Sequence, residues 1–144
     1  MKVKQVILCQ HAVGYENGSF SILGGGLSSA SVPGFPATLP LTVLVHALAD
    51  PSEPPVHHFA ISVRDAQGGI LEIPGPEGRM QPMRLEANLT VKAGPGHPTE
   101  VPLPVNFIPS LPVFIQKPGR FEVRCEVDGE THSESIFVQG PRGA

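Results

Sequence analysis

Strict alternation of apolar and polar residues is the strongest pattern along this chain. It occurs in three segments, and each places apolar side chains on one face of an extended strand and polar side chains on the other. Such a pattern predicts antiparallel sheets with one solvated face. No helical period of 3.6 residues is sustained in the 144 residues. The three apolar sets are Phe59, Ile61 and Val63; Leu85, Ala87, Leu89 and Val91; and Phe121, Val123, Cys125 and Val127.

Six further segments have the length and composition of strands. Segments 6–9 and 41–49 are apolar on both faces, which predicts that these two strands are central in their sheets. The other candidates are 19–24, 70–73, 105–108 and 133–138. Together, about nine strands predict an all-β fold, an antiparallel two-sheet sandwich of the Ig-like type, in one domain spanning residues 1–144.

One core is expected between the two predicted sheets. The chain is long enough to bury such a core without a staple, so Cys9 and Cys125, each inside an apolar run, are expected to be buried thiols. A disulfide joining the two remains the alternative. The predicted core residues are Phe59, Ile61, Val63, Leu85, Leu89, Val91, Phe121, Val123 and Val127.

Proline and glycine, 17 and 16 residues, fall mainly between the apolar runs. Asn17-Gly18 and Asp128-Gly129 are turn dipeptides between strand patterns. A two-residue turn at Asp128-Gly129 would pair Val127 with Glu130, an inward with an outward position, and a bulge would avoid this mismatch. The register of that hairpin therefore stays open. Three long loops are expected at 25–40, 74–82 and 93–104.

Three segments resemble an uncharacterised bacterial family of small β-sandwich proteins, a domain of unknown function. They are the strand 6–9 with the loop ending in Asn17-Gly18, the strand 20–24 with the run 32–36 behind it, and the segment 117–123 with Asp128-Gly129. The resemblance spans nearly the whole chain. It implies a β-sandwich fold and no particular activity.

Charge and hydropathy narrow the range of partners. The net charge is −3, and no basic stripe of the kind that attracts nucleic acid is present. No run approaches the ~18 apolar residues of a membrane span, and the first residues lack a signal-peptide pattern. We therefore expect a cytoplasmic protein with neither nucleic acid nor membrane as its partner.

The sequence contains no catalytic or cofactor motif. The six histidines are scattered without zinc-type spacing, and His57 and His58 point to opposite faces of one strand. No nucleophile elbow of the G-x-S-x-G type occurs. Glu122, Glu126, Glu130 and Glu134 are predicted to lie on a solvated sheet face with cross-strand ion pairs. Catalytic residues, metal and cofactors are therefore not expected.

A non-catalytic interaction or structural module is the favoured function. The alternative is a small-molecule binder with a pocket among the loops at one end, and a metal-dependent or hydrolytic enzyme assembled from distant residues is less favoured. If every connection reverses the chain, loops 25–40 and 93–104 share one end. Phe35 and His97 are then the candidate binding residues, because binding residues concentrate on loops held by a rigid scaffold.

Segment 105–115 suggests self-association. It is strongly apolar and uncharged, and its prolines exclude it from a central strand, so it is expected along an edge or between the sheets. Phe107 and Phe114 are the candidate contact residues of a two-fold homodimer. The alternative is that this segment folds back and covers the core.

Overall fold

The computed structural model describes residues 1–141, and within them thirteen strands and one three-residue 3₁₀ helix, Pro76–Gly78. The all-β prediction is confirmed. The predicted number of strands was too low, because residues 29–31 and 80–82, inside two predicted loops, form strands, and so do residues 11–14 and 110–115. The strands are β1 (Lys2–Cys9), β2 (His11–Gly14), β3 (Phe20–Leu23), β4 (Ser29–Ser31), β5 (Ala37–Ala49), β6 (Val56–Arg64), β7 (Glu72–Pro74), β8 (Met80–Pro82), β9 (Arg84–Thr90), β10 (Leu103–Phe107), β11 (Ser110–Ile115), β12 (Gly119–Val127) and β13 (Glu130–Gln139).

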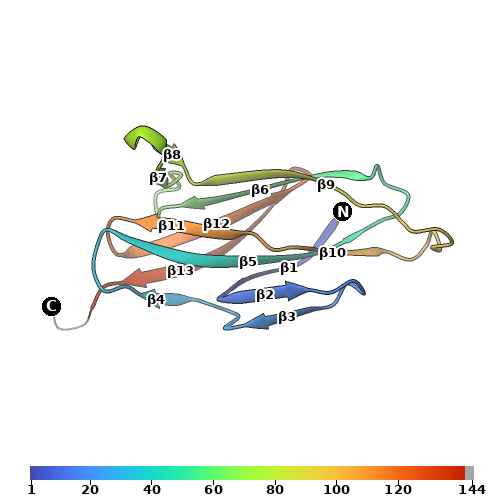
Figure 1. Cartoon of the computed structure of the whole chain (residues 1–144), viewed down its shortest axis with the longest axis horizontal. Coiled ribbons are helices and arrows are strands. Elements are labelled where there is room, and N and C mark those ends of the chain that lie inside the picture. The colour runs from blue at the N-terminus through green and yellow to red at the C-terminus, as the bar shows by residue number, and fades with distance from the viewer. Residues whose placement is uncertain (142–144) are drawn as a thin grey trace.

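Two larger sheets and two small hairpins organise these strands (Figure 1). The first sheet has the order β1-β5-β10, and β11 also pairs with β5. The second sheet has the order β4-β13-β12-β6-β9. All pairs are antiparallel except β4 with β13, which is parallel. The hairpins are β2–β3 and β7–β8.

The largest cluster of buried side chains draws on both larger sheets, and the face of each sheet that contributes to it is called the inner face here. β5 supplies Val43 and Val45, β6 supplies Phe59, and β12 supplies Phe121. Six of the nine predicted core residues are buried, namely Phe59, Ile61, Val63, Phe121, Val123 and Val127. The local alternation therefore identified the inner face of β6 and β12 correctly.

Leu85 was wrongly predicted to be buried. Its side chain is 40% exposed, although it lies opposite the buried Ile61 on the inner face. β9 is the edge strand of the second sheet, with only β6 beside it, so its side chains are covered from one side alone. Leu89 is partly buried against the core, and Val91, just beyond the end of β9, is half-buried.

The position of β1 also differs from the prediction. β5 is central in the first sheet, as predicted, but β1 lies at its edge and pairs only with β5. Its second apolar face is covered from the outside by the hairpin β2–β3, where Cys9, Ala12 and Leu44 form a separate buried cluster. Apolar residues on both faces of β1 therefore indicate that both faces are covered. They do not indicate that β1 has a neighbouring strand on each side.

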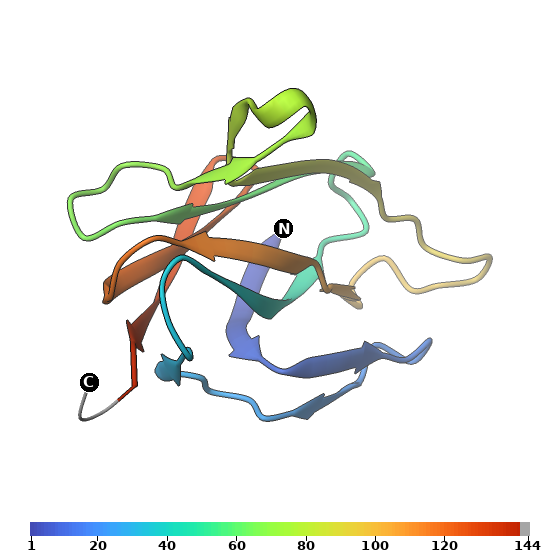
Figure 2. The same cartoon turned by 60° about the vertical axis from the view of Figure 1, so that its left-hand side comes forward.

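The hairpin β2–β3 is fixed firmly to the outer face of the first sheet (Figure 2). The side-chain amide of Asn106 donates to the carbonyl oxygens of Gly18 and Ser19, each at 3.2 Å. The ring of His46 lies 5.2 Å from the ring of Phe20. Gly18 has a φ of +84°, and a Cβ there would lie 2.1 Å from Pro104, so only glycine fits between the turn and β10.

The turn at Asp128-Gly129 contains two residues and no bulge. Val127 pairs with Glu130, and both turn residues have positive φ, 49° and 84°, as a type I′ turn requires. The inner-face positions of β12 are thus continued by Glu130, His132 and Glu134 on β13. The prediction that Glu130 and Glu134 share a face with Glu122 and Glu126 is wrong, because Val127 is paired with a polar residue.

The segment 105–115 runs along an edge, as one of its predicted alternatives stated. β10 and β11 follow each other along the same side of β5 and pair with no other strand in residues 1–141. Phe107, Val113 and Ile115 belong to or pack against the core. Phe114 is half-buried on the outer face.

Candidate functional site

The predicted binding residues are not brought together. Phe35 precedes β5, whereas His97 lies in the connection that leads to β10, whose Leu103 pairs with the last residue of β5, Ala49. The two residues are therefore at opposite ends of the molecule (Figure 1). The prediction assumed that every connection reverses the chain and counted one strand, 70–73, between β6 and β9. The structure has two short strands there, β7 and β8, which pair with each other, so β9 runs antiparallel to β6 and ends away from Phe35. Phe35 packs against the core.

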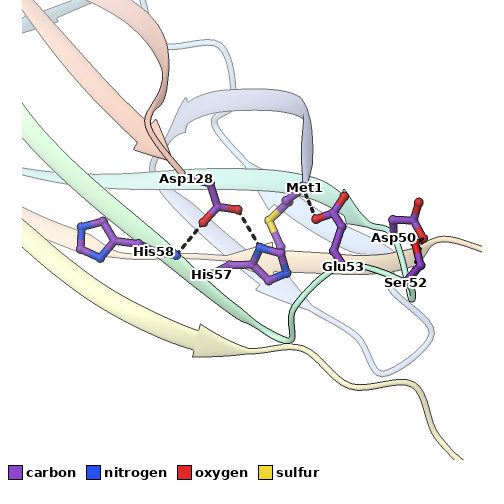
Figure 3. Close-up of polar contacts among 7 residues, drawn as sticks. All are labelled: Met1, Asp50, Ser52, Glu53, His57, His58 and Asp128. Carbon is purple, nitrogen blue, oxygen red and sulfur yellow. Dashed lines mark hydrogen bonds and ion pairs between the residues drawn. The ribbon is translucent and has the colours of Figure 1, made fainter.

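A hollow of about 440 Å³ lies at the end that carries the His97 loop. Lys2, Lys4 and Glu100 are among the residues that line it. Asp50 and Glu53 on its rim are held by local contacts (Figure 3). The Asp50 carboxylate accepts hydrogen bonds from the hydroxyl and the backbone N–H of Ser52, which lower its pKa. The Glu53 carboxylate lies 2.5 Å from the amino group of Met1.

A hydrogen bond joins His57, near the start of β6, to Asp128, in the turn between β12 and β13 (Figure 3). The buried ring of His57 contacts the Asp128 carboxylate through Nδ1 at 2.7 Å. The same carboxylate accepts from the backbone N–H of His58 at 2.9 Å. An Asp–His pair is two thirds of a catalytic triad, but no hydroxyl or thiol in residues 1–141 is hydrogen-bonded to His57. The geometry therefore supports a structural role in which the pair ties the β12–β13 turn to β6.

The two cysteines are both buried and free. Burial raises the pKa of the Cys125 thiol to about 11, and the charge of Glu126 adds to this effect. Burial also raises the pKa of the Cys9 thiol, while a backbone hydrogen bond at His11 offsets part of the rise. The prediction of buried thiols is confirmed.

We expect neither thiol to react rapidly with Ellman's reagent in the native protein, because the thiolate is the reactive species and both side chains are shielded. Unfolding the chain in guanidinium chloride should release two equivalents of reactive thiol. Stoichiometric reaction of the native protein within seconds would contradict the burial of these side chains.

Residues 1–141 contain neither a cluster of metal ligands nor a membrane-spanning helix. No group of three or more His, Cys, Asp and Glu side chains there is placed to hold a metal ion. The same residues include no helix that is long and apolar enough to cross a bilayer.

The outer face of the second sheet is a charged surface. Arg124 donates to the Glu122 carboxylate at 2.8 Å, and this hydrogen bond holds the pKa of Glu122 below its usual range. Arg84 pairs with Glu86 on β9 at 2.6 Å. Because both signs of charge alternate and pair on this face, it is typical of a solvated sheet surface.

The outward side of the hairpin β2–β3 exposes three large apolar or aromatic side chains, and it is called the hairpin face here. Val13, Tyr15 and Leu23 are 40%, 51% and 66% exposed. They alternate with Ala12 and Phe20, which point toward the first sheet. The Tyr15 hydroxyl lies 3.0 Å from Ser21 Oγ, which fixes the ring across the hairpin. Sequence reasoning missed this surface, although the apolar residues on each side of Asn17-Gly18 were a usable signal.

These observations define an all-β protein whose exposed surfaces include one rigidly held apolar hairpin face. A family model matches residues 4–138, and the chain belongs to that family, the family of unknown function DUF6941. The comparison with curated proteins gave no match.

Proposed function

We propose that the protein is a non-catalytic interaction module, an Ig-like two-sheet sandwich that associates with a second copy of itself through the hairpin face. The inner faces of both larger sheets supply one core, which supports the sandwich description. The observation that carries the functional proposal is the exposure of Val13, Tyr15 and Leu23. They lie on a hairpin that hydrogen bonds hold against the first sheet. Large exposed apolar groups on a rigid scaffold are typical of interaction surfaces.

The charge distribution favours an identical copy as the partner. The hairpin face consists of His11, Val13, Tyr15, Ser21 and Leu23, without a carboxylate, lysine or arginine. A two-fold contact places each group near its own copy, so an uncharged face avoids the like-charge repulsion that a chain of net charge −3 meets elsewhere. A two-stranded hairpin also gains stability when its exposed face is covered.

Changing Leu23 to Glu should dissociate the dimer without unfolding the domain. The substitution introduces two carboxylates, one from each copy, into a desolvated contact. Sedimentation velocity of the wild-type chain at about 50 μM should give twice the chain mass, since weak homodimers form at micromolar Kd. Val56→Glu is the matched control, because Val56 is 57% exposed at the start of β6, away from the hairpin.

Two results would count against this interface. A wild-type chain that sediments as a monomer refutes self-association. A dimer that survives Leu23→Glu and is dissociated by Phe114→Glu would place the contact along β11, the edge that the sequence suggested. Circular dichroism of each variant separates dissociation from unfolding.

A further inference from the structure

A polar slot lies between β1 and the half of β13 that follows the turn. Its volume is about 600 Å³, and it is lined by residues 3–7 of β1 and 131–134 of β13. β1 pairs only with β5, and this half of β13 pairs only with β12. The slot therefore lies between two strand edges, one from each larger sheet.

The β13 edge presents unpaired backbone groups to the slot. Antiparallel partners alternate between hydrogen-bonded and non-hydrogen-bonded pairs, and the two-residue turn makes Val127 and Glu130 the first hydrogen-bonded pair. It follows that the N–H and C=O groups of Thr131, Ser133 and Ser135 point away from β12. Further along the strand, Phe137 has the same orientation, and its N–H donates to the Ser28 carbonyl at 2.9 Å.

Of the features that usually protect edge strands, residues 130–135 of β13 carry inward-pointing charge, at Glu130 and Glu134, but neither proline nor a bulge. Natural edges are blunted by proline, by bulges or by charged side chains. The β10–β11 edge carries Pro104 and Pro112, and β1 has a register shift between Val3 and Gln5. Thr131, Ser133 and Ser135, whose backbone groups point away from β12, are uncharged. They pair with β12 in regular register. A regular open edge of this kind is a template for an added strand.

The inner-face side chains of β13 give the slot its chemistry. Nε2 of His132 is shielded from solvent and has no hydrogen-bond partner, and the nearest Glu130 oxygen lies 3.9 Å away. Glu134 is exposed two residues further along the same face. Lys4 is the cation on the opposite wall. A shielded polar nitrogen is normally satisfied in a folded protein, and the two flanking carboxylates favour a positively charged neighbour.

We propose that this slot binds an extended segment of another protein that has a basic residue at every second position. The segment adds as a strand to the Thr131–Ser135 edge, where its backbone pairs with the outward N–H and C=O groups. Its side chains alternate in direction, so every second one faces the inner side, beside Glu130, His132 and Glu134. This site is separate from the hairpin face, and its existence does not depend on self-association.

The experiment uses a fluorescently labelled seven-residue peptide, Lys-Val-Lys-Val-Lys-Val-Lys, capped at both ends, and measures binding to the full chain by fluorescence anisotropy. The same peptide with glutamate in place of lysine is the charge control. We expect saturable binding of the lysine peptide and at least about tenfold weaker binding of the glutamate peptide. No saturable binding of the lysine peptide up to about 1 mM would overturn the proposal.

Ser133→Pro tests the backbone pairing. Proline removes an outward N–H from the middle of the edge and should weaken binding about tenfold. Asn88→Pro is the matched control, because Asn88 holds the equivalent outward position on β9, the other edge of the same sheet. Each substitution also removes one exposed side-chain hydrogen bond, from Ser133 to Glu122 or between Asn88 and His58. Equal weakening by both variants would overturn the assignment to β13.

Glu130→Gln and Glu134→Gln test the charge without a risk to folding, because both side chains are exposed. Each should weaken binding of the lysine peptide about threefold, and added salt should reduce this difference. Glu126→Gln, on the outer face of β12, should leave the affinity unchanged. Binding that is insensitive to both glutamine variants, or equal for the two peptides, would rule out a basic partner.

Discussion

Replacing Phe59 with alanine is expected to lower the free energy of unfolding by about 3–5 kcal/mol. Phe59 is fully buried on the inner face of β6, and its ring lies 4.9 Å from the ring of Phe107 on the opposite sheet. The substitution removes contacts to both sheets and leaves a cavity that close-packed neighbours cannot fill. A loss of this size is a large part of the free energy of unfolding of a typical domain, which is roughly 5–15 kcal/mol.

Guanidinium chloride titration followed by circular dichroism gives the change in the free energy of unfolding. Phe137→Ala is the control, because Phe137 is 48% exposed on the outer face of the same sheet. We expect this control to cost less than about 1 kcal/mol. If Phe59→Ala costs no more than Phe137→Ala, Phe59 does not occupy the centre of the core.

Replacing Asp128 with alanine should destabilise the protein by about 2 kcal/mol, since it leaves the buried Nδ1 of His57 without its partner. Asp128 also accepts from the backbone N–H of His58 and holds a positive φ of 49°. Asparagine tolerates that conformation better than alanine. Asp128→Asn should therefore cost less than Asp128→Ala, and a larger cost for Asn would contradict the role of Asp128 in the turn.

The pH dependence gives this second prediction a separate readout. Burial raises the pKa of Asp128, but the hydrogen bonds from His57 and His58 and the charge of His57 outweigh burial, so the pKa lies below its ordinary value. A carboxyl group with a lowered pKa stabilises the fold above its unfolded pKa of about 3.9, and that contribution is lost as the pH falls through the folded value. The stability difference between the wild-type chain and Asp128→Asn should therefore shrink below about pH 4. A difference that grows on acidification would show that the sign is wrong.

Several features of the fold could be predicted from the sequence because they depend on neighbouring residues alone. The alternation of Phe121, Val123 and Val127 with charged residues identified the inner face of β12, since a strand places successive side chains on opposite faces. Asp128-Gly129 marked a turn because both residues adopt positive φ readily. The prolines of segment 105–115 excluded it from a central strand, because proline lacks the N–H that a central strand needs, and left an edge or a crossing between the sheets as its position.

The candidate surfaces depended on contacts between distant segments. The apolar residues on both faces of β1 indicated that both faces are covered, but only the folded chain shows that a hairpin, and not a second strand, supplies the second cover. The two-residue turn sets the register of β13, and this register places the polar side chain of His132 on the inner face. The hairpin β7–β8, which adds a second short strand between β6 and β9, left Phe35 and His97 at opposite ends.

The sequence by itself thus determined which residues form strands and, within most of them, which side is apolar. Tertiary structure alone decided which strands lie at edges, which loops share an end, and which apolar side chains, such as Leu23 and Leu85, remain exposed. The physical reason is that alternation is a property of one strand. Burial and open backbone edges depend on the segment that packs alongside, and in this chain that segment is often distant in sequence.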